Sequence, residues 1–352
     1  MATPMDVLLV DPLVPEALAW LQERHDVVYL PELADDPAEL RRALAEARAV
    51  VLPPHVVVSQ EFLDHAPHLM MVARMQISSD NTDLNACAQR GVRVLQARSA
   101  TVRSNAEYLL YGLLMLYRRG MVSALLGRKL GQVRMGRELA GSTVGLLGLA
   151  PVAHTLAPML RSLGVRVLGY DPAVHHAAEL WGKLHVEPVP LHELLERADA
   201  ISLQMVYASR FKGWINERLL NHCKPGQLWV GVSRSALFDP EALALALCDG
   251  RIDACLLDGA NAQFAAPGSP LYGIPNLHLT PRLGSHTREA KLRASWYLAH
   301  RIHETLSPDD ARREPGSSDF SMLDSLGFPE SGDPPQSASP SQWASLAALS
   351  RD

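Results

Sequence analysis

The sequence predicts an α/β protein with two doubly wound parallel sheets of the Rossmann or flavodoxin kind. Short apolar strands alternate with helical stretches through residues 1–100, which is typical of a parallel sheet. A βαβ unit whose first turn contains a glycine lies between Ser142 and Pro172. The alternation then continues to about His286. We therefore expect two α/β units in succession.

The first unit is predicted from short apolar runs separated by helical stretches. Strands that alternate with helices pair in parallel, because each helix carries the chain back to the same end of the sheet. The predicted strands are Val7–Val10, Val27–Leu30, Ala49–Leu52, Met70–Ala73 and Val92–Leu95. The predicted helices are Pro15–Arg24, Pro37–Ala47, Gln60–His65 and Asp83–Arg90.

A long apolar helix at Ser104–Tyr117 leads into the second unit, and a final helix is predicted at Arg288–Leu306. The second unit is expected to be a parallel sheet as well. Its predicted strands are Thr143–Leu147, Val165–Tyr170, Ala200–Gln204, Gln227–Val232, Ala254–Asp258 and Leu277–Thr280.

The βαβ unit has the frame of a dinucleotide site. Gly148 makes the turn after the first strand, and Gly164 ends the helix that follows. Asp171 ends the next strand, about twenty positions past the glycine, where an acidic residue would hold a ribose hydroxyl. A carboxylate there favours NAD over NADP, because it repels a 2′-phosphate. The helix is predicted to pack through one face, made of Val152, Leu156, Met159, Leu160 and Leu163.

The phosphate loop of this unit departs from the G-x-G-x-x-G/A pattern. The sequence offers Gly148, Ala150 and Ala153 at the patterned positions. Ala150 adds a methyl group where the backbone approaches a pyrophosphate. Pro151 suits the first position of a helix but lacks one of the N–H groups that bind phosphate there. The loop predicts weakened binding of NAD.

Composition indicates an ordinary globular protein in the cytoplasm. Of 352 residues, 47% are hydrophobic and 20% are charged, and the net charge of -5 gives no reason to expect nucleic acid or an anionic membrane as a partner. No apolar run is long enough to span a membrane, and the N-terminus runs directly into a strand without a secretory signal. The four cysteines show no metal-ligand spacing, so we expect reduced thiols and no metal site.

The composition changes after Ser307, where Pro, Ser, Gly and Asp dominate. Such a segment cannot bury enough apolar surface to fold, so residues 307–352 are predicted to be a disordered tail. Its partner is unknown. Two segments, DFSMLDSLGF and SQWASLAAL, place apolar residues among polar ones, and they are either short docking segments or part of a plain flexible extension.

Several motifs in order resemble the D-2-hydroxyacid dehydrogenases, the family that includes phosphoglycerate and glyoxylate reductases and the C-terminal-binding-protein corepressors. The resemblance covers roughly residues 5–305. The motifs are DNTDLNACAQRGVRV, SNAEYLLYGLLMLYRR, GRELAGSTVGLLGL, LGVRVLGYDP, KPGQLWVGVSRSALFDPEAL and GIPNLHLTPRLGSHTREA.

The resemblance implies a split substrate domain, residues 1–100 plus 288–306, and an NAD-binding domain, residues 101–287, with an interdomain cleft between them. It also implies a homodimer, NAD as cofactor and a small 2-oxo or 2-hydroxy acid as substrate. Arg234 matches the arginine that binds the substrate carboxylate, which a guanidinium can contact through two parallel hydrogen bonds. The implied substrate loop contains Gln76, Ile77 and Ser78, where the family usually has small glycines. The implied cofactor-binding residues are Gly148, Ala150, Pro151, Val152, Asp171, Tyr207, Ser233 and Asp258.

The acid–base pair of the family is replaced in this sequence. Asn261 stands where the family has a glutamate, and Arg282 stands where it has the proton-donating histidine. A guanidinium stays protonated at physiological pH, so it cannot cycle a proton. The two changes are mutually consistent, because a glutamate has no imidazole to orient once the histidine is lost. We therefore expect hydride transfer to be impaired or lost.

Other residues leave alternatives open. His286, in GSHTRE, is either a substitute proton donor or a surface residue near a helix start, and the phenol of Tyr207 is a conceivable donor. Arg234 and Arg282 either form a double-cation site for a dicarboxylate or phosphorylated acid, or Arg282 pairs with a nearby acid or with water. Four functions remain: an impaired NAD-linked oxidoreductase, an active one with a substitute donor, a non-catalytic ligand-binding scaffold or pseudoenzyme, and a different reaction at the same carboxylate-binding cleft.

Overall fold

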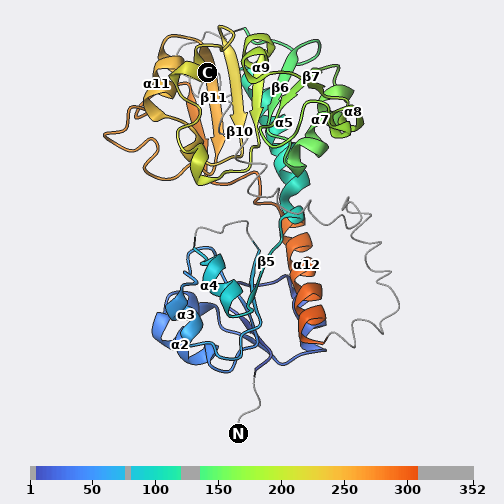
Figure 1. Ribbon diagram of the computed structural model, residues 1–352, viewed down its shortest axis with the longest axis vertical. Helices are drawn as coiled ribbons and strands as arrows, with labels where there is room; N and C mark the ends of the chain where they lie inside the picture. Colours follow the sequence, from blue (N-terminus) through green and yellow to red (C-terminus); the bar gives the residue numbers. More distant parts are fainter. Residues whose placement is uncertain (1–4, 76–80, 120–134, 308–352) are drawn as a thin grey trace. The chain divides into compact units, whose positions relative to one another are not determined.

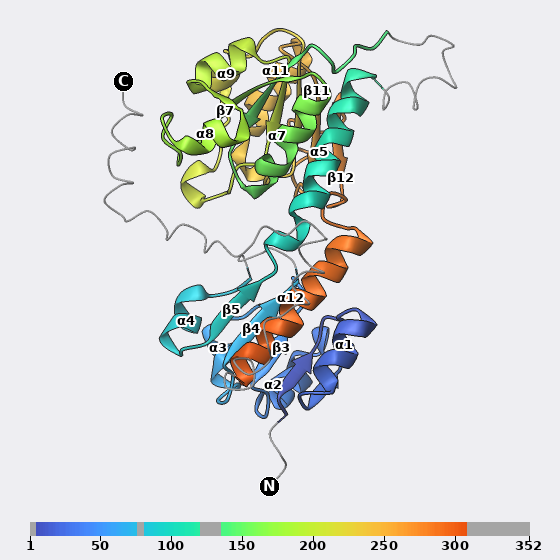
Figure 2. The same cartoon turned by 90° about the vertical axis from the view of Figure 1, so that its right-hand side faces the viewer.

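The computed structural model describes residues 5–75, 81–119 and 135–307, and these residues form two parallel sheets with helices between the strands (Figures 1 and 2). The predicted α/β class with two doubly wound sheets is confirmed. The predicted tail, residues 307–352, lies outside the described residues apart from Ser307. The cleft and the domain boundaries stay predictions.

The first sheet has the strand order β2-β1-β3-β4-β5, and every pairing in it is parallel. Alternate residues point to opposite faces of the strands, so the sheet has two separate apolar cores. Helices α2, α3 and α4 cover one face, and α1 and the last helix, α12 (Arg288–Leu306), cover the other (Figure 2). The bounds are β1 Val7–Leu9, α1 Pro15–Gln22, β2 Val27–Tyr29, α2 Pro37–Leu44, β3 Ala49–Val51, α3 Gln60–Asp64, β4 Met71–Arg74, α4 Leu84–Gln89 and β5 Arg93–Gln96.

The second sheet has the order β12-β11-β10-β9-β6-β7-β8, again with parallel pairings. The strand order reverses between β6 and β9, which is the position where doubly wound sheets bind ligands. Helices α5, α7 and α8 cover one face, and α9, α10 and α11 cover the other. Figure 1 labels all of these helices except α10. The bounds are α5 Val102–Tyr117, β6 Thr143–Leu147, α7 Pro151–Ser162, β7 Arg166–Tyr170, α8 Glu179–Leu184, β8 Glu187–Pro188, α9 Leu191–Arg197, β9 Ala200–Leu203, α10 Glu217–Leu220, β10 Gln227–Gly231, α11 Pro240–Cys248, β11 Ile252–Asp258, β12 Leu277–Thr280 and α12 Arg288–Leu306.

The last helix, α12, returns to the first sheet, as expected. Its buried residues Ala294, Leu298 and Ile302 belong to the same apolar core as residues of β1 and β3. The guanidinium of Arg293 is buried and donates to the carbonyl of Ala100 at 2.9 Å, which ties α12 to the turn before α5. Two segments far apart in the sequence thus close one core.

The structure corrects some details of the predicted elements. Leu163 was placed on the packed face of α7, but it follows the last helical residue as the C-cap and is 41% exposed. The buried positions of α7 are Ala153, Leu156, Ala157 and Leu160. Helix α2 ends at Leu44 rather than Ala47, because the following amides bond carbonyls three residues back in turns. The short strand β8 was not predicted at all.

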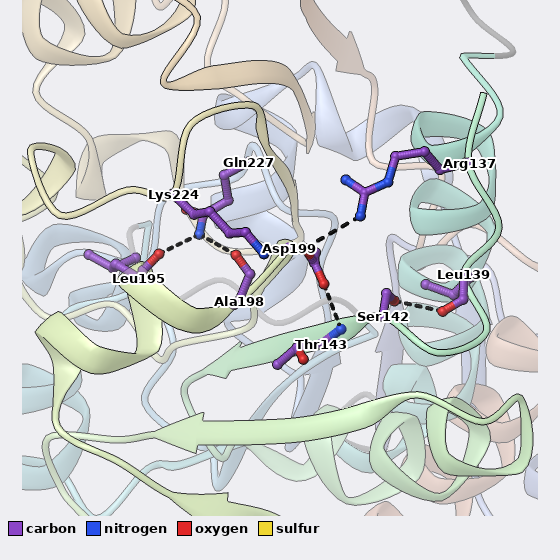
Figure 3. Close-up of polar contacts among 9 residues, drawn as sticks. All are labelled: Arg137, Leu139, Ser142, Thr143, Leu195, Ala198, Asp199, Lys224 and Gln227. Atoms are coloured by element: carbon purple, nitrogen blue, oxygen red, sulfur yellow. Dashed lines mark hydrogen bonds and ion pairs between the residues drawn. The ribbon is translucent and has the colours of Figure 1, made fainter. Parts of the chain in front are cut away.

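Asp199 forms several polar contacts at the edge of the seven-stranded sheet where its strands begin. We call this edge the amino edge. The carboxylate of Asp199 accepts from Lys224 Nζ at 2.6 Å, from Arg137 at 3.4 Å and from the backbone N–H of Thr143 at 2.9 Å (Figure 3). Burial raises the pKa of Asp199, but these donors outweigh burial and hold it below its usual value. Gln227 Nε2 donates to the carbonyls of Leu195 and Ala198 beside it. Every charge in this group has a partner.

Candidate functional site

The predicted site residues of the second unit lie along the opposite edge of the seven-stranded sheet, where its strands end, here called the carboxyl edge. Parallel register brings the ends of neighbouring strands together: Gly231 of β10 pairs with Leu257 of β11, and Asp258 pairs with Thr280 of β12. The residues that follow these strands are therefore neighbours in space.

The glycine loop after β6 is held in a tight turn. Gly148 has φ +99°, and a Cβ there would meet backbone atoms of Met205 at 2.6–2.7 Å, so only glycine fits. Helix α7 begins at Pro151, with Ala150 as an N-cap that provides no side-chain hydrogen bond. The N–H of Ala153 bonds the carbonyl of Ala150 at 2.7 Å. The backbone N–H of Val152 lies in the same first turn, where the helix dipole favours an anion.

Asp171 faces this loop from the end of β7. One carboxylate oxygen accepts from the N–H of Leu149 at 2.6 Å, and the other accepts from the N–H of Ala173 at 2.7 Å. The carboxylate is thereby fixed beside the glycine loop, at the strand end where the sequence pattern placed it.

Gln204, which the sequence analysis did not single out, joins the two strands at the switch point. It is buried, and its amide donates to the carbonyl of Gly148 at 2.7 Å while its oxygen accepts from Ser202 at 2.8 Å. A polar side chain at the end of an apolar strand was the available signal, since a buried amide needs partners. The hydroxyl of Ser233 similarly donates to the carbonyl of Met205 at 2.9 Å.

Arg234 follows β10 and is half-buried. Its guanidinium carbon lies 5.1 Å from the ring centroid of Tyr207, which is a cation–π distance. The next residue, Ser235, is buried, and its hydroxyl accepts the N–H of Asn261 at 3.4 Å. Asn261 itself is exposed. The loops that carry Tyr207, Arg234 and Asn261 therefore meet at the carboxyl edge.

Asp258, the last residue of β11, is buried and both of its oxygens are used. One accepts from the hydroxyl of Thr280 at 2.6 Å and from the N–H of Leu283 at 2.8 Å, and the other accepts from the N–H of Gly284 at 2.8 Å. The hydroxyl of Tyr108 on α5 lies 2.6 Å from that of Thr280, and burial raises the pKa of Tyr108 to about 12. This carboxylate orders the loop after β12.

Arg282 sits in that loop with φ +58°, in the left-handed region. Its side chain passes over Gly259, where a Cβ would lie only 2.7 Å from Arg282 Cγ. The residue is exposed, and no carboxylate in ranges 5–75, 81–119 and 135–307 forms an ion pair with it. Pairing of Arg282 with a nearby acid is therefore not observed among these residues, and both the double-cation site and a side chain that points to water stay predictions.

The remaining predicted residues are dispersed or undescribed. His286 is exposed, and its N–H bonds the carbonyl of Leu283 at 3.1 Å. Gln76, Ile77 and Ser78 lie outside the described residues. Arg74, the last residue of β4 and two positions before Gln76, is buried and donates to the carbonyls of Pro53 and Val56, each at 2.7 Å.

Within the part of the chain that the structure describes, no cluster of three or more His, Cys, Asp or Glu side chains is arranged to hold a metal ion. None of the described helices has the length and apolar character needed to cross a membrane.

Comparison with known proteins finds relatives that align with nearly the whole α/β region. Residues 114–284 match the family model described as the D-isomer specific 2-hydroxyacid dehydrogenase, NAD binding domain. The chain is 32% identical over 304 residues to (S)-sulfolactate dehydrogenase of Chromohalobacter salexigens, an alignment that covers 86% of this chain and 98% of that protein. The chain belongs to the D-isomer-specific 2-hydroxyacid dehydrogenase family. The resemblance inferred from the motifs is confirmed.

Other members of the family align over the same region. The chain is 33% identical over 304 residues to D-3-phosphoglycerate dehydrogenase of Mycobacterium tuberculosis, which covers 86% of this chain but only 57% of that longer protein. A crystal structure of a Thermus thermophilus protein superposes with a TM-score of 0.73 at 27% identity, covering 86% of this chain and 97% of the other. D-mandelate dehydrogenase of Rhodotorula graminis shares the fold, with a TM-score of 0.74 at 21% identity over 85% of this chain and 94% of the other.

Proposed function

We propose that this 2-hydroxyacid dehydrogenase relative binds NAD and a small 2-oxo or 2-hydroxy acid with a second anionic group, and that its standard hydride transfer is impaired or lost. The observation that carries the proposal is Arg282. It lies exposed at the carboxyl edge, next to Gly259 and without a carboxylate partner among the described residues, where the family resemblance expects a proton donor.

The residues at the glycine loop fit a dinucleotide. Gly148 permits the turn, the N–H of Val152 lies in the first turn of a twelve-residue helix, and Asp171 is fixed beside the loop. Pro151 leaves that turn with one donor fewer, so we expect binding weaker than a complete G-x-G-x-x-G loop gives. Tyr207, Ser233 and Asp258 complete the proposed cofactor region. NAD would supply or accept the hydride when bound.

Two arginines define the proposed acid site. Arg234 would bind the carboxylate of the substrate through its planar fork, and Arg282 would bind a second anionic group. The names of two relatives, sulfolactate and 3-phosphoglycerate dehydrogenase, refer to acids that carry such a second group. The substrate loop at Gln76, Ile77 and Ser78 is proposed to contribute to the same site.

Loss of proton transfer follows from the chemistry of Arg282 and Asn261. A reduced 2-oxo acid needs a proton on its nascent alkoxide, and neither a guanidinium nor an amide can cycle one near neutral pH. Two alternatives make different predictions. An active enzyme would use His286 or Tyr207 as donor, whereas a non-catalytic scaffold would bind ligand without turnover.

Titration with NADH and a panel of 2-oxo acids separates these functions. We expect saturable nicotinamide fluorescence but slow turnover by the native protein. Introducing Arg282→His with Asn261→Glu should raise the rate about a hundredfold or more, which is the usual contribution of a general acid. Asn261→Glu alone is the control and should not raise it. Turnover by the native protein at an ordinary rate would refute the proposed loss of hydride transfer. If the fluorescence does not saturate below millimolar NADH, the non-catalytic scaffold becomes the remaining function.

The assembly is proposed to follow the family. The apolar core shared by β1, β3 and α12 supports a substrate domain of residues 1–100 plus 288–306, which leaves 101–287 as the NAD-binding domain. Tyr111 and Leu114 on α5 are 52% and 42% exposed, which supports a homodimer that covers this helix. Light scattering during gel filtration tests the dimer, and a monomer at micromolar concentration would contradict it.

A further inference from the structure

The conformation of Arg282 is unusual for a residue with a side chain. Its φ of +58° lies in the left-handed region, which a Cβ disfavours and which glycine or asparagine normally occupies. Such a conformation persists only where the surroundings determine it strongly. The contacts around Arg282 should therefore explain how this conformation is maintained.

Asp258 fixes the backbone on both sides of Arg282. It accepts hydrogen bonds from the side chain of Thr280 before Arg282 and from the N–H groups of Leu283 and Gly284 after it. Ser104 Oγ then donates to the carbonyl of Gly284 at 2.5 Å. The turn is thus held from β11 and α5 by groups that do not involve the guanidinium.

Gly259 provides the surface on which the Arg282 side chain lies. The carbonyl of Thr280 accepts the N–H of Gly259 at 2.8 Å and the N–H of Arg282 at 3.0 Å, so one oxygen holds both residues together. A Cβ on Gly259 would lie 2.7 Å from Cγ, 3.6 Å from Cδ and 3.5 Å from Nε of Arg282. Any larger residue at position 259 would push the arginine stem away.

We infer that Asp258 and Gly259 are positioning residues that present the Arg282 guanidinium as the second cation of the acid site, so that position 259 determines selectivity for doubly anionic acids. The inference rests on the proposed function. Asp258 sets the direction of the Cα–Cβ bond, and Gly259 leaves the space in which the stem lies flat. Arg234 then binds the carboxylate common to all 2-oxo acids, and Arg282 discriminates among them.

The test compares Gly259→Ala with Gly273→Ala. Gly273 has φ +75°, close to the +71° of Gly259, but no atom lies within 4 Å of a Cβ built there. Both variants place a Cβ on a residue with a similar positive φ, and only Gly259→Ala brings that Cβ against Arg282. Each is made in the native protein and in the Arg282→Ala protein, which lacks the Cγ that would clash.

Binding is measured by calorimetry with 3-phosphoglycerate, which has two anionic groups, and with D-lactate, which has one, both in the presence of NAD. We expect Arg282→Ala and Gly259→Ala each to weaken 3-phosphoglycerate binding about tenfold or more, the value of one charged hydrogen bond. D-lactate binding should change little, and Gly273→Ala should leave both affinities unchanged. In the Arg282→Ala protein, Gly259→Ala should have no further effect.

The outcomes distinguish the two ideas. If Arg282→Ala weakens 3-phosphoglycerate binding but the two glycine variants behave alike, the positioning role of Gly259 is overturned and the second cation stands. If Arg282→Ala leaves that binding unchanged, the second cation of the proposed function is refuted, together with the selectivity assigned to position 259. Thermal midpoints give an independent reading: Gly259→Ala should melt below Gly273→Ala, and the difference should vanish when Arg282 is alanine.

Discussion

The two edges of the seven-stranded sheet use charge in opposite ways. At the amino edge, Asp199 is nearly buried and is bonded by Lys224, Arg137 and a backbone amide. At the carboxyl edge, Arg282 is exposed and has no carboxylate partner among the described residues. The nearby carboxylate of Asp258 instead accepts hydrogen bonds from the backbone N–H groups of Leu283 and Gly284. Removal of one partner from a buried charge pair destabilises a fold, whereas an exposed cation without a carboxylate partner is available to a ligand.

The largest effect is expected from Arg234, at the carboxyl edge. If Arg234 binds the substrate carboxylate through two hydrogen bonds, as proposed, Arg234→Ala should weaken binding of 2-oxo acids about a hundredfold or more. The thermal midpoint should stay close to that of the native protein, because the residue is only half-buried. Calorimetry with pyruvate and a melting curve measure the two quantities on one sample.

Arg161→Ala, an exposed arginine in the last turn of α7, is the matched control for loss of one positive charge. It should change neither quantity. A large drop in the melting midpoint of Arg234→Ala with unchanged binding would reverse the comparison, because it would make the carboxyl edge structural.

The amino edge should respond in the opposite sense. Asp199→Asn leaves Lys224 and Arg137 without their carboxylate and should lower the free energy of unfolding by about 1–2 kcal/mol, with unchanged binding of NADH and acids. Because the pKa of Asp199 is held below its usual value, its stabilising contribution is fully present above the pKa of the unfolded chain and is lost as pH falls through the lower pKa of the folded chain. Urea unfolding at neutral pH measures the effect.

Glu187→Gln serves as the comparison for Asp199→Asn. Glu187 also pairs with two arginines, Arg166 and Arg197, but its side chain is 41% exposed against 12% for Asp199. An exposed pair contributes about 1 kcal/mol or less. Equal losses of unfolding free energy in the two variants would show that the burial of Asp199 does not increase its contribution to stability.

The sequence predicted the strands better than the backbone geometry around Arg282, for a physical reason. Apolar strands and the helix Arg288–Leu306 are encoded by local periodicity, and α12 has the predicted bounds. The two-residue strand β8 is too short to leave such a pattern. The position of Arg282 depends on contacts between residues far apart in the sequence, such as Tyr108 with Thr280. It also depends on a left-handed backbone conformation, which an arginine in the sequence does not predict.

The smallest effect is expected on the pH dependence of stability, and it comes from a pair of histidines that lies at neither edge of the seven-stranded sheet. His25 and His303 are both buried, and His25 Nε2 lies 2.9 Å from His303 Nδ1. Burial lowers the pKa of His25, and His303 lowers it further, whereas Asp6, itself paired with Arg48, opposes the shift. The unfolded chain therefore binds protons more readily than the folded chain below the usual value of 6.5.

Stability should consequently fall as pH is lowered through 6.5, well before the contribution of Asp199 is lost. Urea unfolding from pH 8 to pH 5 measures the slope, and His25→Gln should flatten it while costing some stability at pH 8. His278 on β12 is buried with a lowered pKa as well, so His278→Gln gives the comparison outside the histidine pair. If His25→Gln leaves the slope unchanged, the acid response belongs to other groups, and the pair is ordinary packing between the turn after α1 and helix α12.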